Sequence, residues 1–319
     1  MKILITGVAG FVGFSIANKL LKDKRNFVYG IDNFDNYYSI KYKKKRLSQI
    51  IKKKNFFFKY IDIRQKSKIQ NLFKNNYFDV VMHFAAQAGV RYSLINPKKY
   101  IEVNKKGFEN LLNALKEKPP QKIIFASSSS VYGNSKKLPT NEKNILKPNN
   151  VYAKTKINNE KLAKMYKKKF GLNICGLRFF TVYGEWGRPD MFLFKLLKAY
   201  KKKNFFYLNN FGNHTRDFTY SGDVVKILNK LVKLKKFNFD IANICNSNPV
   251  NIRFICKNFQ KKYNFKKIKL VEKNKADVLN THGDNRKIKK IVKMKKFTPF
   301  NVGFKKTSNW YFKKSIYKF

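Results

Sequence analysis

The chain has 319 residues, of which 43% are hydrophobic and 16% aromatic, so it can bury a large core and is too apolar for a disordered chain. No apolar run reaches 18 residues, which predicts no transmembrane helix. The net charge of +53 suggests binding to nucleic acid or to a membrane surface. However, of the 71 basic residues nine are arginine and 62 are lysine, whereas phosphate and base recognition favours arginine. Lysine has A/T-rich codons, so we interpret the charge mainly as a result of drift in the base composition of the genome.

Short apolar runs and helical patterns alternate along the first 180 residues. Strands are predicted at residues 2–6, 27–31, 56–61, 80–84, 122–126 and 173–179. Helices are predicted at residues 11–22, 40–54, 69–75, 104–118 and 151–170, the last with Asn149 and Asn150 as candidate caps. This alternation implies an α/β fold with a doubly wound parallel sheet, a Rossmann fold.

Two domains are expected. Residues 1–178 would form a dinucleotide-binding Rossmann domain, to which residues 213–245 return, and residues 179–319 would form mainly a smaller α/β domain for the substrate. The three cysteines form no CxxC pair, which indicates a reducing compartment, and the N-terminus has no signal-peptide layout. We therefore expect a cytoplasmic protein.

Three of the 15 glycines, Gly7, Gly10 and Gly13, lie between the first predicted strand and helix. Residues without Cβ let the backbone approach a pyrophosphate, which then rests on the helix N-terminus. The second strand is followed by Asp32, placed to hydrogen-bond the adenosine ribose. A carboxylate there repels a 2′-phosphate, so the cofactor is predicted to be NAD. Asp62 and Ile63, after the third strand, are candidates for the adenine.

A candidate catalytic group combines a tyrosine, a lysine and a serine cluster. Tyr152 and Lys156 lie one turn apart on one face of the helix predicted at 151–170. A phenol has a reference pKa of about 10, and a neighbouring ammonium lowers it toward the range of a useful base. Ser127–Ser130 follow the strand predicted at 122–126, at the sheet edge where such folds bind ligands.

Together these motifs resemble the extended short-chain dehydrogenase/reductase family. Within it the chain is most similar to the nucleotide-sugar epimerases, and in particular to the UDP-glucuronate 4-epimerases. Long strings carry the resemblance, at residues 32–38, 83–93, 178–184, 187–191 and 216–220. Five of the nine arginines lie in or near these strings or in the C-terminal region, which suits a ligand with a diphosphate and a carboxylate: Arg91, Arg178, Arg188, Arg216 and Arg286.

The resemblance implies a reaction and a set of residue roles. Tyr152 would take the proton of the sugar C4 hydroxyl while hydride passes to NAD, Ser128 would bind the same oxygen, and Lys156 would tune Tyr152. The implied cofactor residues are Gly7, Gly10, Phe11, Val12, Gly13, Asp32, Asn33, Asp62, Ile63, Phe84, Ala85, Ala86, Gln87, Asn104, Tyr152 and Lys156. The implied substrate residues are Arg91, Ser128, Ser129, Ser130, Thr181, Arg188, Met191, Arg216 and Asp277.

The serine stretch discriminates among sister reactions. In this family, decarboxylases carry a glutamate there and 4,6-dehydratases an Asp–Glu pair, but Ser127–Ser130 and Val131–Gly133 contain no acid. Epimerisation of UDP-glucuronate to UDP-galacturonate through a 4-keto sugar is therefore favoured. The alternatives are 4-epimerisation of a neutral UDP-hexose (UDP-glucose or UDP-N-acetylglucosamine) and, from another class, a basic nucleic-acid-binding protein on a Rossmann scaffold.

The expected partners follow from the same interpretation. We expect a UDP-sugar substrate, no specific nucleic acid, no membrane, and a homodimer formed through helices 104–118 and 151–170. His83, His214 and His282 lack the spacing of metal ligands and are interpreted as structural, so no metal is expected.

Overall fold

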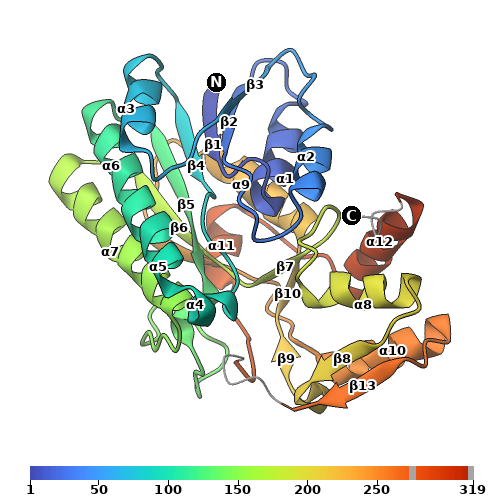
Figure 1. Ribbon diagram of the computed structural model, residues 1–319. Coiled ribbons are helices and arrows are strands. Elements are labelled where there is room, and N and C mark those ends of the chain that lie inside the picture. Colours follow the sequence, from blue (N-terminus) through green and yellow to red (C-terminus); the bar gives the residue numbers. More distant parts are fainter. Residues whose placement is uncertain (273–277, 315–319) are drawn as a thin grey trace.

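A seven-stranded sheet of parallel strands forms the centre of the computed structural model, which describes residues 1–272 and 278–314 (Figure 1). The strand order is β11-β6-β5-β4-β1-β2-β3. Strands are added outward in one direction from β1 and in the other from β4, as is typical of doubly wound sheets. The strands are β1 (Lys2–Thr6), β2 (Phe27–Asp32), β3 (Phe56–Tyr60), β4 (Val80–His83), β5 (Lys122–Ser128), β6 (Ile174–Phe179) and β11 (Ile241–Ile244). The predicted fold class is confirmed.

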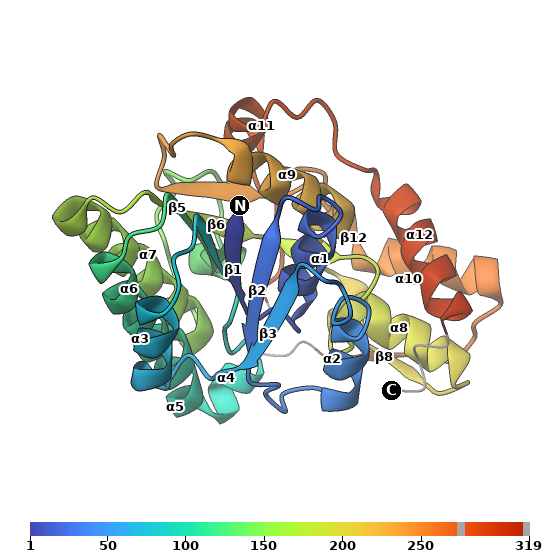
Figure 2. The same ribbon diagram turned by 90° about the horizontal axis from the view of Figure 1, so that it is seen from above.

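Helices cover both faces of this sheet because each carries one apolar stripe (Figure 2). One face buries side chains of α3 (Lys66–Lys74), α6 (Gly107–Glu117) and α7 (Val151–Phe170). The other buries side chains of α1 (Phe11–Leu20), α2 (Ile40–Leu47), α9 (Ser221–Lys233) and α11 (Arg286–Ile291). Two short helices, α4 (Tyr92–Ile95) and α5 (Pro97–Tyr100), and a π-helical turn (Ile101–Lys106) precede α6.

A smaller region with its own apolar core lies below the sheet in Figure 1. Its helices are α8 (Phe192–Lys201), α10 (Ile252–Tyr263) and α12 (Phe300–Lys313). Its strands pair two by two: β7 (Thr181–Tyr183) with β10 (Phe218–Tyr220), β8 (Phe206–Asn209) with β13 (Ile268–Val271), and β9 (Thr215–Arg216) with β12 (Val250–Asn251). Residues 221–244 return to the main sheet as α9 and β11, while the domain boundary at residue 178 stays a prediction.

Several predicted boundaries are wrong, and packing explains the differences. The helix expected at 40–54 ends at Leu47, because the chain turns there to bury Ile50 before it enters β3. The helix expected at 104–118 begins with the wider π-helical turn. Strand β5 continues to Ser128, so Ser127 and Ser128 belong to the strand rather than to the loop after it.

Helix α7 spans the predicted residues 151–170, since both of its ends have strong local signals. The Asn150 side chain accepts a hydrogen bond from the Ala153 amide at 2.9 Å, which caps the helix N-terminus. Gly171 ends the helix in the left-handed conformation (φ +66°). Of the two candidate caps, Asn150 is the one that acts. The helix therefore fixes the rotation of Tyr152 and Lys156 toward the sheet.

Candidate active site

A cavity of about 1110 Å³ lies at the carboxyl edge of the sheet, between the sheet and the smaller region. Its volume lies slightly above the usual range for small-molecule sites, about 300–1,000 Å³. Every predicted cofactor residue lines it except Asn104, and so do all predicted substrate residues within the described part of the chain. Asp277 lies outside the described residues. Segments distant in sequence thus meet around one space.

The turn from β1 to α1 fits the pyrophosphate of a dinucleotide. Gly7 has φ +71°, and a Cβ on it would lie 2.6 Å from the Ala85 nitrogen. No side chain caps the N-terminus of α1, so its amide groups stay open toward the cavity. A Cβ on Gly13 would lie 2.3 Å from the Gly7 oxygen, so this glycine lets helix and turn pack closely. The turn is therefore shaped for an anion at the helix N-terminus.

Asp32 and Asp62, the two acids expected to bind the adenosine, both line the cavity. The Asp32 carboxylate accepts hydrogen bonds from the amides of Ala9 (3.0 Å) and Phe34 (2.8 Å), and burial raises its pKa although Lys43 opposes the shift. Asp62 accepts from Asn33 Nδ2 at 2.8 Å and from Arg64, which was not predicted. Both carboxylates are thus held in place by neighbouring donors.

Tyr152, Lys156 and Ser128 meet on the sheet side of the cavity. The Lys156 Nζ is buried, donates to the Ala126 carbonyl at 2.9 Å and lies 5.8 Å from the centre of the Tyr152 ring. Burial raises the pKa of the Tyr152 phenol above its usual value, although the Ser128 hydroxyl and the charge of Arg188 lower it, so the net lowering expected from a neighbouring ammonium is not found. Burial also lowers the pKa of Lys156 to about 8, against the opposing charge of Glu160. Tyr152 and Ser128 can therefore act on one substrate oxygen, with the Lys156 ammonium next to the Tyr152 ring.

Behind these residues lies a buried ion pair that the sequence reasoning missed. Arg178 on β6 donates to both carboxylate oxygens of Glu160 on α7, at 2.9 and 2.7 Å, and both side chains are less than a tenth exposed. Ser127 on β5 donates to Glu160 at 2.5 Å. One carboxylate thus joins α7, β5 and β6. The spacing of Lys156 and Glu160, four residues on one helix face, was the available signal.

Asn104 is buried behind the cavity wall. Its side chain accepts from the Gln87 amide at 2.8 Å and donates to the Gln87 carbonyl and to Thr155, both at 3.1 Å. It therefore fixes the segment after β4 against α7. Any action on the cofactor would pass through those neighbours.

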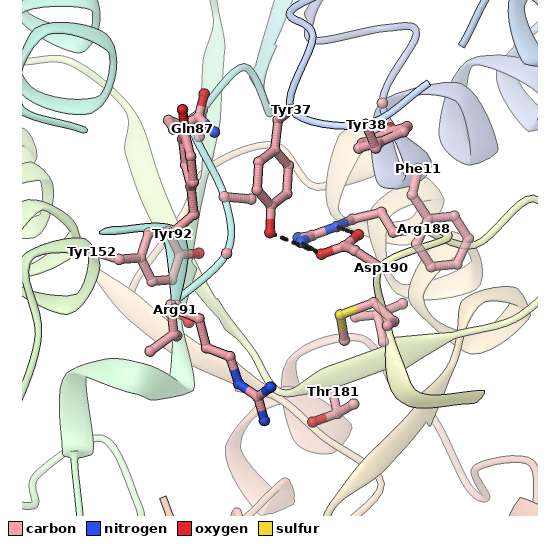
Figure 3. Close-up of a pocket in the computed structure, with 18 of the residues that line it drawn as sticks. Phe11, Tyr37, Tyr38, Gln87, Arg91, Tyr92, Tyr152, Thr181, Arg188 and Asp190 are labelled. Carbon is pink, nitrogen blue, oxygen red and sulfur yellow. Dashed lines mark hydrogen bonds and ion pairs between the residues drawn. The ribbon is translucent and has the colours of Figure 1, made fainter. Parts of the chain in front are cut away.

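On the far side of the cavity Arg188 forms a bidentate ion pair with Asp190, at 3.0 and 2.5 Å (Figure 3). The Tyr37 hydroxyl donates to the same carboxylate at 3.1 Å. Although burial lowers it, the Asp190 charge brings the pKa of Arg188 above its usual value. Figure 3 shows this cluster facing Tyr92 and Tyr152 across the cavity, with Arg91 and Thr181 at its lower edge.

Not all five highlighted arginines belong to the cavity. Arg91, Arg188 and Arg216 line it. Arg178 and Arg286 do not line it. Arg178 turns inward to Glu160, and Arg286 pairs with Asp284 at the surface, where it is 86% exposed. In both cases a neighbouring carboxylate, Glu160 or Asp284, binds the guanidinium and keeps it away from the cavity.

Among the described residues, no group of three or more His, Cys, Asp or Glu side chains is placed to hold a metal ion. His83 is buried against Thr6 at 2.8 Å, and burial lowers its pKa to about 3, so it is neutral. His214 lines the cavity.

Asp217, which the sequence analysis did not predict as a site residue, is fully buried and accepts hydrogen bonds from the amides of Asn246 and Gly283.

Gly7→Ala is expected to lower NAD affinity by about tenfold or more. The added Cβ meets the Ala85 backbone, and a left-handed non-glycine residue costs about 1–3 kcal/mol. NAD retained after purification measures the effect. Gly171→Ala is the matched control: its φ is also positive, but nothing lies within 4 Å and the residue is outside the cavity wall. Equal loss of NAD in both variants would contradict the assignment.

The doubly wound sheet, the uncapped glycine turn and the Tyr/Lys pair define a dinucleotide-dependent enzyme of the short-chain dehydrogenase/reductase class. The chain belongs to the NAD dependent epimerase/dehydratase family, whose model matches residues 3–245.

The chain is also similar to individual proteins of this family over nearly its whole length. An uncharacterised protein of Methanocaldococcus jannaschii is 39% identical over 97% of this chain and 95% of its own. UDP-glucuronate 4-epimerase 4 of Arabidopsis thaliana is 37% identical over 97% of this chain and 75% of its own. The crystal structure of UDP-glucuronic acid 4-epimerase from Bacillus cereus, with UDP-glucuronic acid and NAD, has a TM-score of 0.92 and 29% identity. That comparison covers 98% of this chain and 100% of the other.

Proposed function

We propose that this chain is an NAD-dependent UDP-glucuronate 4-epimerase, an isomerase that interconverts UDP-glucuronate and UDP-galacturonate through a 4-keto sugar. The observation that carries the proposal is the likeness, over nearly the whole chain, to epimerases named for this substrate. The Tyr152, Lys156 and Ser128 side chains that line one cavity with the glycine turn support it.

In this proposal each residue acts on a stated atom. The Tyr152 oxygen accepts the proton of the sugar C4 hydroxyl, Ser128 hydrogen-bonds the same oxygen, and the Lys156 ammonium stabilises the phenolate. Bound NAD supplies the hydride acceptor and donor of the reaction at its nicotinamide. The glycine turn and Asp32 would hold the cofactor, with the other cofactor residues named above completing the wall.

The sugar carboxylate and the diphosphate need separate partners. Ser128–Ser130 line the cavity beside the catalytic group, and Arg188 and Thr181 line it from other sides. Together they would receive the carboxylate, which favours the uronate over a neutral UDP-hexose. Arg216 lines the cavity from β9 and would bind the diphosphate, with Arg91 and Met191 as further wall residues. The serine stretch offers no acid for decarboxylation or dehydration.

A substrate panel tests the proposal. Purified protein without added NAD is incubated with UDP-glucuronate, UDP-glucose or UDP-N-acetylglucosamine, and the anomeric NMR signals are followed. We expect UDP-galacturonate from UDP-glucuronate and little conversion of the neutral sugars. Conversion mainly to UDP-xylose, or none at all, would overturn the proposal. Preferred conversion of a neutral sugar would favour the alternative substrate.

Activity is expected to fall above about pH 8. Lys156 is charged below its lowered pKa of about 8 and neutral above it, so the support for the phenolate is lost as the pH rises. The pH profile of kcat measures this. In Lys156→Arg the guanidinium stays charged throughout, so the alkaline decline should disappear even though the rate is lower. An unchanged decline in that variant would assign it to another group.

We further propose a cytoplasmic homodimer that supplies UDP-galacturonate for surface polysaccharide. Cys175, Cys245 and Cys256 are free and buried, as expected in a reducing compartment. Ile101 and Met165, on the π-helical turn and α7, are 43% and 49% exposed and would pack in a dimer interface.

No helix of the described residues is long and apolar enough to cross a membrane. Specific nucleic-acid binding is not expected, and any DNA binding should vanish at physiological salt.

A further inference from the structure

Arg46 on α2 is a completely buried side chain, with no exposed surface. No ion pair within 4.0 Å involves it in the described parts of the chain, and its Nε has no hydrogen-bond partner there. Its charge reaches the buried Asp32 carboxylate and its guanidinium lies 4.8 Å over the Tyr42 ring, but burial of a charge without a direct ion pair is costly and calls for a structural or functional reason. It does not line the cavity, so it does not act by direct contact with a ligand.

The guanidinium instead joins three loops of the cavity wall. Nη1 donates to the Ala9 carbonyl of the glycine turn at 2.6 Å and to the Tyr38 hydroxyl at 2.9 Å. Nη2 donates to the Trp186 carbonyl at 2.7 Å, directly before Gly187 and Arg188. These loops follow β1, β2 and β7, which are far apart in the sequence. Arg46 is the donor common to all three.

The two segments that Arg46 joins, the glycine turn and the loop after β7, lie at the proposed sites for NAD and for the UDP-sugar. The Ala9 amide donates to Asp32, at the adenosine end of the cavity, while the Ala9 carbonyl accepts from Arg46. The loop after β7 is held tightly: Trp186 has φ +61°, and a Cβ on Gly187 would lie 2.9 Å from the Gly184 oxygen. A shift of this loop therefore moves Arg188 as well.

We infer that Arg46 is a positioning residue that couples the cofactor turn to the loop carrying Arg188, so that NAD and the UDP-sugar strengthen each other's binding. The inference rests on the proposed function for the identity of the two ligands. By linkage, the effect must be reciprocal: whatever the sugar nucleotide does for NAD, NAD does equally for the sugar nucleotide.

The test measures exchange of bound NAD for isotope-labelled NAD, with and without UDP-glucuronate. In the parent protein UDP-glucuronate should slow the exchange by about fivefold or more. In Arg46→Met, which keeps the apolar stem but removes the donors, the ratio of the two rates should fall close to one. Tyr42→Phe is the matched control, because Tyr42 donates to Gly187 at 3.0 Å on the same loop but makes no bond to the glycine turn. It should keep the ratio.

Arg46→Lys provides a second variant in case the methionine protein does not fold. It retains the charge but cannot reach all three loops, so the rate ratio should still fall. No slowing in the parent protein, or a ratio preserved in the folded Arg46 variants, would overturn the inference. Because exchange needs no turnover, coupling without any epimerised product would contradict the proposed function and leave the role of Arg46 standing.

Discussion

Tyr152→Phe is expected to lower kcat by about 10³-fold, within the range that a positioned acid–base group contributes. The substitution removes only the phenol oxygen, which is the proposed acceptor of the C4 hydroxyl proton. The ring keeps its packing against Tyr100, whose centre lies 6.1 Å away, so the protein should fold and retain NAD. Product formation from UDP-glucuronate measures kcat, and the absorbance of the purified protein reports its NAD content.

Tyr166→Phe on the same helix is the matched control for this prediction. Its hydroxyl donates to Asn113 at 2.8 Å on the face away from the cavity wall, so its loss should leave kcat close to that of the parent. A loss of activity smaller than about tenfold in Tyr152→Phe would contradict the proposed role. So would a loss accompanied by release of NAD, because the effect would then be on cofactor binding.

Arg178→Met is expected to destabilise the protein by about 3–5 kcal/mol, because it leaves the Glu160 carboxylate buried without its cation. That cost corresponds to a fall in Tm of about 4–8 °C for a chain of this size. The ion pair also joins α7, which carries Tyr152 and Lys156, to β6, and Ser127 ties it to β5. Activity should therefore fall together with stability, as measured by thermal unfolding and by kcat.

The control removes an equivalent pair at the surface. Arg25 is 88% exposed and pairs with Asp23 at 2.9 Å, so Arg25→Met should leave Tm unchanged within error. Equal effects of the two substitutions would show that burial of the Arg178 pair is not decisive. In Arg178→Met with Glu160→Met, where no charge is left buried, stability should recover more than activity, since apolar replacement of a whole pair is often tolerated.

Local patterns predicted much of the fold. Strand β1 and helix α7 have the predicted bounds, because alternating burial and clear caps act over a few residues. Helix α2 is shorter than predicted because burial of Ile50 forces a turn that no local signal announces. The exact end of β5, which places Ser128 in the strand, also depends on pairing with β6.

Local sequence was enough to predict the glycine turn, the acid at the end of the second strand and the Tyr152/Lys156 spacing, because each depends on a few neighbouring residues. Which arginines line the cavity depends on the packing of distant segments. Arg178 pairs with Glu160 and Arg46 joins three loops, whereas Arg188 faces the cavity. The physical reason is that a guanidinium takes the acceptors that packing brings to it, and those acceptors come from distant segments. In a chain of charge +53, the place of an arginine in the fold therefore decides whether its side chain lines the cavity, and the number of basic residues does not.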